Sequence, residues 1–479
     1  MLSDENQNWQ SPLSTRYASA AMRRVFSNEQ KFRNWRRLWL ALAESEHELG
    51  LPVSAEQVAE LRANVDIVDH ELAAKYEREL RHDVMAHVHA WGDICPKARA
   101  IVHLGATSCF VTDNSELMAL REGVQLVRRH LIGTIRALVD FARRWKDQPA
   151  LGLTHYQPAQ ATTVGKRACL WLQDLCNNLV DLDHIEEQIR FRGVKGTTGT
   201  QASFLELFNG DHAKVRELDR LVTERMGFKR TFAITGQTYP RQLDFRVLSV
   251  LSSIAQSASK FAVDIRLSAG RRELEEPFEK KQIGSSAMPW KRNPMRCERI
   301  GALSRHVISL LDNPAHTAAN QWFERTLDDS ANRRMALAES FLAVDSILQL
   351  MQNVSGGLVC HAAVVERHLR EELPFLATEI LMMEAVKNGA DRQDAHERIR
   401  VLAHQASEAI HNGLENPLRD LLATDSLFGS VAAHWDELLD PARFVGRAPE
   451  QVVEFLDGEV EPLLQRHADI APAETEIRV

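Results

Sequence analysis

The chain has 479 residues, of which 44% are hydrophobic and 26% are charged, and its formal net charge is −8. This is ordinary globular composition, which excludes a disordered or fibrous protein, and the length predicts two to four domains or subdomains around a large core. The negative charge argues against nucleic acid or an acidic membrane surface as a partner, so any anionic ligand must be held by a local cluster of basic side chains.

The beginning of the chain has none of the marks of a leader peptide. The first seven residues, MLSDENQ, include acidic side chains and no basic group before an apolar run, so we expect neither a secretory signal nor a transit peptide. No stretch approaches 18 consecutive apolar residues, which predicts no membrane span. The six cysteines include no Cys-x-x-Cys pair, so we expect reduced, mostly buried thiols and a cytoplasmic protein.

Helical patterns begin near the amino terminus. Ser27 and Gln30 have the spacing of a capping box, and apolar residues then recur at helical intervals until Gly50 and Pro52. We therefore expect a helical amino-terminal domain over 1–111.

The middle of the chain has long runs without glycine or proline, at 166–192, 241–269 and 315–355. The last run would extend ~60 Å if it formed a single helix. Helices of this length cannot bury their surface within one ordinary domain, so a central bundle over 112–360 that continues across subunits is expected, and with it an obligate oligomer.

Glycine and proline become frequent again after Ser355, which favours a third, smaller helical domain over 361–479. The predicted fold class is mainly α, with three helical domains and a central long-helix bundle that completes a multi-subunit helical core.

The segment 282–298, QIGSSAMPWKRNPMRCE, is the most informative stretch for chemistry. Gly284, Pro289 and Pro294 predict a loop followed by a helix that begins near 293–294. Loops that carry Ser, Lys and Asn on a helical frame are typical functional segments, although composition alone equally fits an ordinary surface turn.

Within that stretch, GSSAMPWKRNP at 284–294 resembles the signature loop of the fumarase/aspartase superfamily, whose members break C–N or C–O bonds to release fumarate. Two other superfamily regions follow the expected order, HLGATS at 103–108 through Asn114 and THYQPAQATTVGK at 154–166. Segments 81–89, 192–204 and 321–334 resemble, more narrowly, the animal-type branch that acts on adenylosuccinate. Trp290 and Ala161 are small departures from the pattern, and the resemblance is weakest near the carboxyl terminus.

This resemblance implies a β-elimination that releases fumarate from adenylosuccinate, giving AMP, and from succinyl-aminoimidazole carboxamide ribotide in purine nucleotide biosynthesis. It implies Ser285 as the base and His155 as the general acid, with no metal and no organic cofactor. A serine hydroxyl is a weak base and needs cationic or backbone N–H support, for which Lys291 is the nearest candidate in sequence. Imidazole suits the acid because it exchanges its proton near neutral pH.

The substrate carries two carboxylates and a phosphate, which require local basic and hydrogen-bonding groups. The resemblance places this binding on Arg16, Tyr17, Arg81, His82, Asp83, Thr107, Ser108, Gln237, Lys291, Arg299, Arg325, Ser330 and Arg334. These positions lie far apart in sequence. Members of the superfamily combine motifs from three subunits of a homotetramer in each site, so a homotetramer with shared sites is implied here.

Two alternatives stay open: a sister lyase such as argininosuccinate lyase, and a catalytically silent structural relative. His82, His87 and His89 are interpreted as satisfied or substrate-facing side chains rather than metal ligands, because no His-Glu-x-x-His pattern is present. Asp328 and Asp329 are interpreted as a network that orients nearby arginines.

Overall fold

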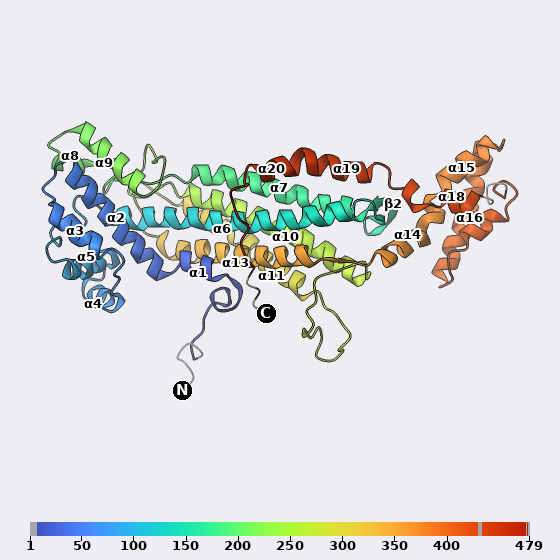
Figure 1. Ribbon diagram of the computed structural model, residues 1–479, viewed down its shortest axis with the longest axis horizontal. Coiled ribbons are helices and arrows are strands. Elements are labelled where there is room, and N and C mark those ends of the chain that lie inside the picture. Colours follow the sequence, from blue (N-terminus) through green and yellow to red (C-terminus); the bar gives the residue numbers. More distant parts are fainter. Residues whose placement is uncertain (1–6, 430–433, 476, 478–479) are drawn as a thin grey trace.

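A computed structural model of the chain describes residues 7–429, 434–475 and 477. The structure is an elongated helical bundle with smaller groups of helices at its two ends (Figure 1). The predicted mainly-α class is confirmed. No helix of the described part is long and apolar enough to cross a lipid bilayer.

The amino-terminal group consists of the π-helical turn η2 (Leu13–Tyr17) and the helices α1 (Ala20–Val25), α2 (Asn28–Glu48), α3 (Ala55–Ala63), α4 (His70–Leu80) and α5 (Asp83–Ile94). α3, α4 and α5 lie at one end of the bundle, whereas η2 and α1 pack along its side, on α13 and α6 (Figure 1). Ser27 caps α2 as predicted, accepting from Gln30 N–H at 3.1 Å, but the Gln30 side chain donates to Asn34 instead of completing a capping box. Trp35, Trp39 and Trp91 are buried and hold α2 against α5.

The bundle itself is built from five long helices. They are α6 (Ser108–Arg144), α7 (Val164–Gln188), α10 (Gln242–Gly270), α11 (Met295–Leu310) and α13 (Ser330–Gly357), with α8 (Ala202–Leu207), α9 (His212–Arg225) and α12 (Asp312–Ala319) as shorter connections. α6 packs against α7 and α13, and α10 packs against α7, α11 and α13. The runs 166–192 and 241–269 thus correspond closely to α7 and α10.

The run 315–355 does not form a single helix. α12 ends at Ala319 and α13 begins at Ser330, and between them Phe323 adopts a left-handed conformation with φ of 50°. Asp329, at the end of this break, is buried and accepts hydrogen bonds from Arg241 and Arg325. Because a buried carboxylate needs hydrogen-bond partners, these contacts hold the chain in a turn here. Nothing in the sequence indicated this turn, since the segment contains no glycine or proline.

The chain also forms short strands that the periodicity did not predict. β1 (Pro149–Thr154) and β2 (Gln157–Thr163) make an antiparallel hairpin just beyond the end of α6, in which Thr154 pairs with Gln157. β3 (Leu274–Glu275) pairs with β4 (Val359–Cys360) at the base of the segment that leads to α11.

The remaining helices form a second core at the other end of the bundle. They are α14 (Ala362–Leu376), α15 (Thr378–Lys387), α16 (Arg392–His411), α17 (Leu418–Ala423), α18 (Trp435–Leu438) and the turn η4 (Pro441–Arg443). α19 (Ala448–Phe455), η5 (Leu456–Val460) and α20 (Glu461–Gln465) then return along the bundle beside α7 (Figure 1). The segment 361–479 therefore contributes to two cores.

The six cysteines are free and five of them are buried, as expected from the sequence.

Candidate active site

Two helix amino termini meet where α5 and α6 begin. His82 is the N-cap of α5 and accepts from Met85 N–H at 3.3 Å through Nδ1, and its Nε2 lies 3.4 Å from the hydroxyl of Ser108. Thr107 is the N-cap of α6. Helix amino termini carry partial positive charge and unpaired N–H groups, which favour an anion.

Arg81, Asp83 and Arg334 surround this meeting point. Arg81 ends α4 in the left-handed conformation, with φ of 53°. Asp83 Oδ2 lies 3.6 Å from Arg334 NH2, which joins α5 to the first turns of α13, where Ser330 is also located. We call the set Arg81, His82, Asp83, Thr107, Ser108, Gln237, Arg325, Ser330 and Arg334 the helix-end cluster.

Gln237 links two loops to the first turn of α6. Its Oε1 accepts from the thiol of Cys109 at 3.3 Å, its Nε2 donates to Thr197 O at 3.0 Å, and its backbone N–H donates to Glu324 O at 2.9 Å. Burial raises the pKa of Cys109 to about 11, so the thiol stays protonated as the donor. Gln237 therefore fixes the segment 192–204, which contains Thr197, and the α12–α13 connection relative to α6.

Buried charged side chains orient Arg325. Its NH1 donates to Asp329 at 2.8 Å, and Asp329 also accepts from Arg241 Nε at 2.7 Å. Arg241 in turn donates to both carboxylate oxygens of Asp113 on α6. Asp329 has the orienting role predicted for it, whereas Asp328 is exposed and bonds only with Thr326 among the hydrogen bonds of the described residues.

Arg16, Tyr17 and Arg299 lie together at a second place. The guanidinium of Arg299, in the second turn of α11, stands 5.3 Å from the centroid of the Tyr17 ring. Arg16 is exposed beside it in η2, which packs on α13. We call these three residues the arm cluster.

His155 lies at a third place, the tip of the β1–β2 hairpin. His155 and Tyr156 form its two-residue turn with φ of 54° and 60°, and both side chains are exposed. A left-handed conformation at two consecutive non-glycine residues is uncommon, and such strain is concentrated at functional positions.

Ser285 and Lys291 belong to the loop between β3 and α11, which extends away from the bundle (Figure 1). Ser285 Oγ accepts from Met288 N–H at 3.1 Å, and Asn293 Nδ2 donates to Gly284 O at 2.8 Å. Backbone N–H support for Ser285 is thus present, while no hydrogen bond joins Lys291 to Ser285 among the described residues.

A single chain does not bring all these residues together. The 37 residues of α6 extend roughly 55 Å at the usual helical rise. Ser108 is the first residue of this helix. The hairpin that bears His155 lies beyond the other end of the helix, where Gln148 O accepts from Val164 N–H and closes the base of the hairpin. The helix-end cluster and His155 therefore lie at opposite ends of the bundle (Figure 1).

Lys31 lies beside the helix-end cluster, although no motif in the sequence includes it. Its ammonium stands 4.9 Å from the centroid of the Trp35 ring and 5.3 Å from that of Phe32. Burial lowers the pKa of Lys31, as does the charge of Arg334, while Asp83 opposes the shift. The only feature of the sequence that could have indicated Lys31 is its position one helical turn before the buried Trp35 on α2.

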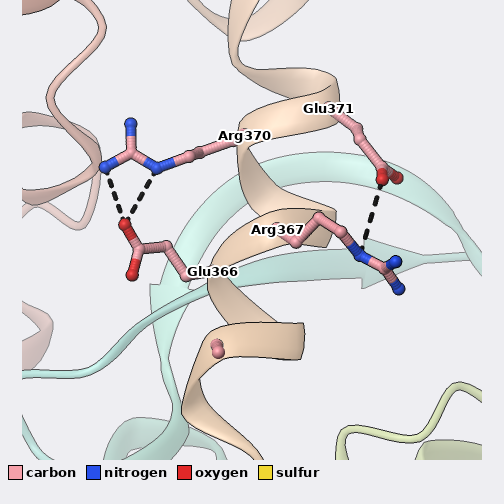
Figure 2. Close-up of a pocket in the computed structure, with 5 residues that line it drawn as sticks. Glu366, Arg367, Arg370 and Glu371 are labelled. Atoms are coloured by element: carbon pink, nitrogen blue, oxygen red, sulfur yellow. Dashed lines mark hydrogen bonds and ion pairs between the residues drawn. The ribbon is translucent and has the colours of Figure 1, made fainter. Parts of the chain in front are cut away.

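The hollow drawn in Figure 2 lies on α14 and is lined by Ala363, Glu366, Arg367, Arg370 and Glu371. Its charges are neutralised by exposed pairs one helical turn apart, Arg370 with Glu366 at 2.6 Å and Arg367 with Glu371 at 3.8 Å. None of the predicted site residues lines this hollow, so we do not assign it to the site.

Comparisons with known proteins agree with the motifs. The family described as Lyase matches residues 18–309, and the family described as Adenylosuccinate lyase C-terminus matches residues 374–455. A protein of Saccharomyces cerevisiae named adenylosuccinate lyase is 51% identical over 462 residues, which is 96% of each chain. One of the same name from Schistosoma mansoni is 45% identical over 479 residues, covering 99% of this chain and 100% of the relative.

Solved structures show the same fold at lower identity. The 3-carboxy-cis,cis-muconate lactonizing enzyme of Pseudomonas putida superposes with a TM-score of 0.81 at 24% identity, covering 95% of this chain and 99% of the other. A fumarate lyase of Mesorhizobium sp. BNC1 gives 0.79 at 22% identity, with 93% and 99% covered. At these identities the likeness shows the fold alone.

Proposed function

Because this chain belongs to the adenylosuccinate lyase family, we propose that it releases fumarate from adenylosuccinate, giving AMP, and from succinyl-aminoimidazole carboxamide ribotide. It is a lyase of purine nucleotide biosynthesis. The observation that carries the assignment is 51% identity over 96% of the chain, which extends through both ends of the bundle and all the motif segments.

The elimination needs a base that removes a proton from the carbon next to a carboxylate and an acid that protonates the leaving nitrogen. We assign the base to Ser285 and the acid to His155. The Met288 N–H that already donates to Ser285 Oγ supports the first role, because it stabilises negative charge on that oxygen. The exposed position of His155 in a left-handed two-residue turn supports the second, because it leaves the imidazole available to a ligand.

The helix-end cluster and the arm cluster would bind the anionic groups of the substrate. Both gather basic side chains against the negative charge of the whole chain, and the helix-end cluster adds the N–H groups at the amino termini of α5 and α6. Arginine forms paired hydrogen bonds to carboxylates and phosphates, and Arg325 and Arg334 are already oriented by Asp329 and Asp83. We include Lys31 in the helix-end cluster on the same grounds.

We propose that the active assembly is a homotetramer in the cytoplasm, with each site built from several subunits. Two observations support shared sites: α6 separates the helix-end cluster from His155 by its whole length, and large apolar side chains are exposed beside Gln237 and Arg325. Those apolar side chains are Phe323, 92% exposed, Ile234, 85% exposed, and Leu327, 71% exposed. Exposed apolar groups of this size are typical of an interface. The division into 1–111, 112–360 and 361–479 also stays a proposal.

The test is fumarate release, followed by absorbance and confirmed by mass spectrometry, from adenylosuccinate and in parallel from argininosuccinate. We expect release from adenylosuccinate only, lost in Ser285→Ala and kept in Ser286→Ala, its exposed neighbour. Release from argininosuccinate alone would favour the sister lyase. A folded oligomer that releases fumarate from neither substrate would favour a structural protein.

A further inference from the structure

Ser19 attaches the amino-terminal arm, which we define as residues 13–19, to the middle of the bundle. Its backbone N–H donates to Asp345 Oδ2 at 2.7 Å and its hydroxyl donates to Asp345 Oδ1 at 3.1 Å. The same hydroxyl oxygen accepts from Met22 N–H at 3.1 Å as the N-cap of α1. Asp345 lies midway along α13 and its side chain is 0% exposed. The contact therefore joins positions 326 residues apart without access to water.

Asp345 is itself the centre of a buried network. Gln349 donates to it at 3.0 Å, and His130 Nε2 on α6 lies 3.5 Å from its Oδ1. His130 Nδ1 lies 3.2 Å from Gln352, whose amide donates to Ala473 O at 3.1 Å. The network thus joins the arm, α6, α13 and the carboxyl-terminal segment.

A buried carboxylate is not a general requirement for holding helices together. Removing a carboxylate from water is unfavourable unless its partners repay the lost hydration, and an apolar residue of similar size is often as stable. The nearby α13 residues Val344, Ile347 and Leu348 belong to the apolar core of the bundle. Its distinctive contribution is to accept two hydrogen bonds from one residue of the arm, and so to fix where that residue lies.

Two residues of the arm cluster, Arg16 and Tyr17, lie in the arm just ahead of Ala18 and Ser19. Only Ala18, 1% exposed, separates Tyr17 from Ser19, so the position of Ser19 determines where the Tyr17 ring meets Arg299. Leu13 is buried at the start of the same turn and provides the second attachment. Between these attachments Arg16 is exposed.

We propose that Asp345 is a positioning residue for substrate binding: through Ser19 it holds Arg16 and Tyr17 in the geometry that receives the substrate's anionic groups. The proposal rests on the function proposed above, in which these two residues bind substrate. Asp345 lies inside the bundle and acts on the substrate only through the arm.

The experiment compares steady-state kinetics of Asp345→Asn, Ser19→Ala and Ser19→Thr with those of the wild-type tetramer. Loss of a hydrogen bond to a charged group corresponds to roughly a tenfold to hundredfold change in affinity. We expect KM to rise by about that factor in Asp345→Asn and Ser19→Ala, while kcat stays within about threefold, because the proton-transfer groups are untouched. Ser19→Thr keeps the hydroxyl and should restore the wild-type KM.

Ser27→Ala is the matched control. Ser27 caps α2 in the same way, accepting from Gln30 N–H at 3.1 Å, and in the described part of the chain its hydroxyl donates to Arg24 O and not to Asp345. Both serine-to-alanine variants lose a helix cap, and Ser19→Ala should be the less stable of the two because it also removes the hydroxyl that donates to the buried Asp345. Only Ser19→Ala should lose substrate affinity. An unchanged KM in Asp345→Asn, or an equal rise in Ser27→Ala, would overturn the proposal.

A second measurement separates this proposal from the assigned function. Limited trypsin digestion followed by mass spectrometry reports cleavage after Arg16, and we expect faster cleavage in Asp345→Asn than in the wild type. If the wild type released no fumarate, the assigned function would fail, yet the digestion would still show whether Asp345 holds the arm. Equal cleavage rates would remove Asp345 from that role.

Discussion

Arg325 and Asp329 form an ion pair within the connection between α12 and α13, with NH1 2.8 Å from Oδ1, and the carboxylate is buried while the guanidinium reaches the helix-end cluster. The other oxygen of Asp329 accepts from the buried Arg241 at 2.7 Å. The aspartate thereby connects a proposed substrate-binding arginine to the interior of the bundle. Its contribution to the stability of the fold can be measured directly.

Replacing Asp329 with asparagine should lower the free energy of unfolding by about 3 kcal/mol, because Arg241 and Arg325 lose a buried anionic partner. Urea unfolding at one fixed protein concentration measures the change. Asp328→Asn is the control, since Asp328 is exposed, and it should change stability by less than about 0.5 kcal/mol. Equal losses in the two variants would contradict the buried ion pair.

The same pair predicts how stability depends on acid. Burial alone would raise the pKa of Asp329, but the charge of Arg241 and the hydrogen bonds from Arg241 and Arg325 hold that pKa below its ordinary value. A lowered pKa means that the folded protein is stabilised above the unfolded pKa of about 3.9, and that this stabilisation is lost as the pH falls through the folded value. The stability difference between wild type and Asp329→Asn should therefore be full at pH 7 and shrink below about pH 4. A difference that grows on acidification would show the opposite shift.

Mixing two inactive variants tests whether sites are shared. Ser285→Ala and His155→Ala should each lose at least about a hundredfold in turnover, because each lacks one proton-transfer group. If each site takes these residues from different subunits, random reassembly of an equal mixture should recover about a quarter of the wild-type activity. Each variant dissociated and reassembled alone should stay inactive. Absence of recovery in a mixture that forms mixed tetramers would show that each chain supplies both groups to one site.

Gly284 allows the signature loop to fold on itself. A Cβ at this position would meet Lys291 O at 2.1 Å, so Gly284→Ala must displace the backbone next to Ser285. Misplacing a catalytic group by about 1 Å costs on the order of a hundredfold in rate, so kcat should fall by about that factor with little change in melting temperature. Gly270→Ala is the control, because a Cβ there meets no atom within 4 Å. Wild-type kcat in Gly284→Ala would argue against a requirement for this turn.

Lys31→Met tests the ammonium that the motifs did not reveal. Methionine keeps the apolar stem over Trp35 and removes the charge, so KM should rise by about tenfold, the effect of one lost charged hydrogen bond. Lys214→Met is the control, since Lys214 also lies over an aromatic ring, Phe208, but donates to Leu49 O away from the cluster. Competitive inhibition by AMP and by fumarate then identifies the bound group. An unchanged KM would place Lys31 outside the site.

The elements that periodicity predicts are those in which the local pattern and the packing agree. α7 and α10 fall within a few residues of the runs that lack glycine and proline, and the Ser27 cap is present. The break at 320–329 was not predictable, because it depends on Asp329 meeting Arg241, a residue 88 positions earlier. The β1–β2 hairpin was missed because its polar residues, the turn at His155 and Pro158 give no clear alternation.

The candidate site could likewise be predicted only in part from the sequence. Motifs select residue types that the chemistry requires, such as His82 and Ser108, and these two side chains do meet. Motifs carry no information on topology, so the separation of His155 from them by the length of α6 emerges only from the fold. Asp345 has no motif at all, because its role depends on a contact with Ser19 from the opposite end of the chain.

The uninterrupted length of α6 limits how the gene can change. Inserting one codon within it would turn everything beyond by about 100° and shift it by about 1.5 Å, which would rotate α7 away from α10 and the hairpin away from α14. Gains and losses of residues among natural variants should therefore be excluded from 108–144. They should be concentrated in exposed connections such as 412–416, where no helix has to keep its phase.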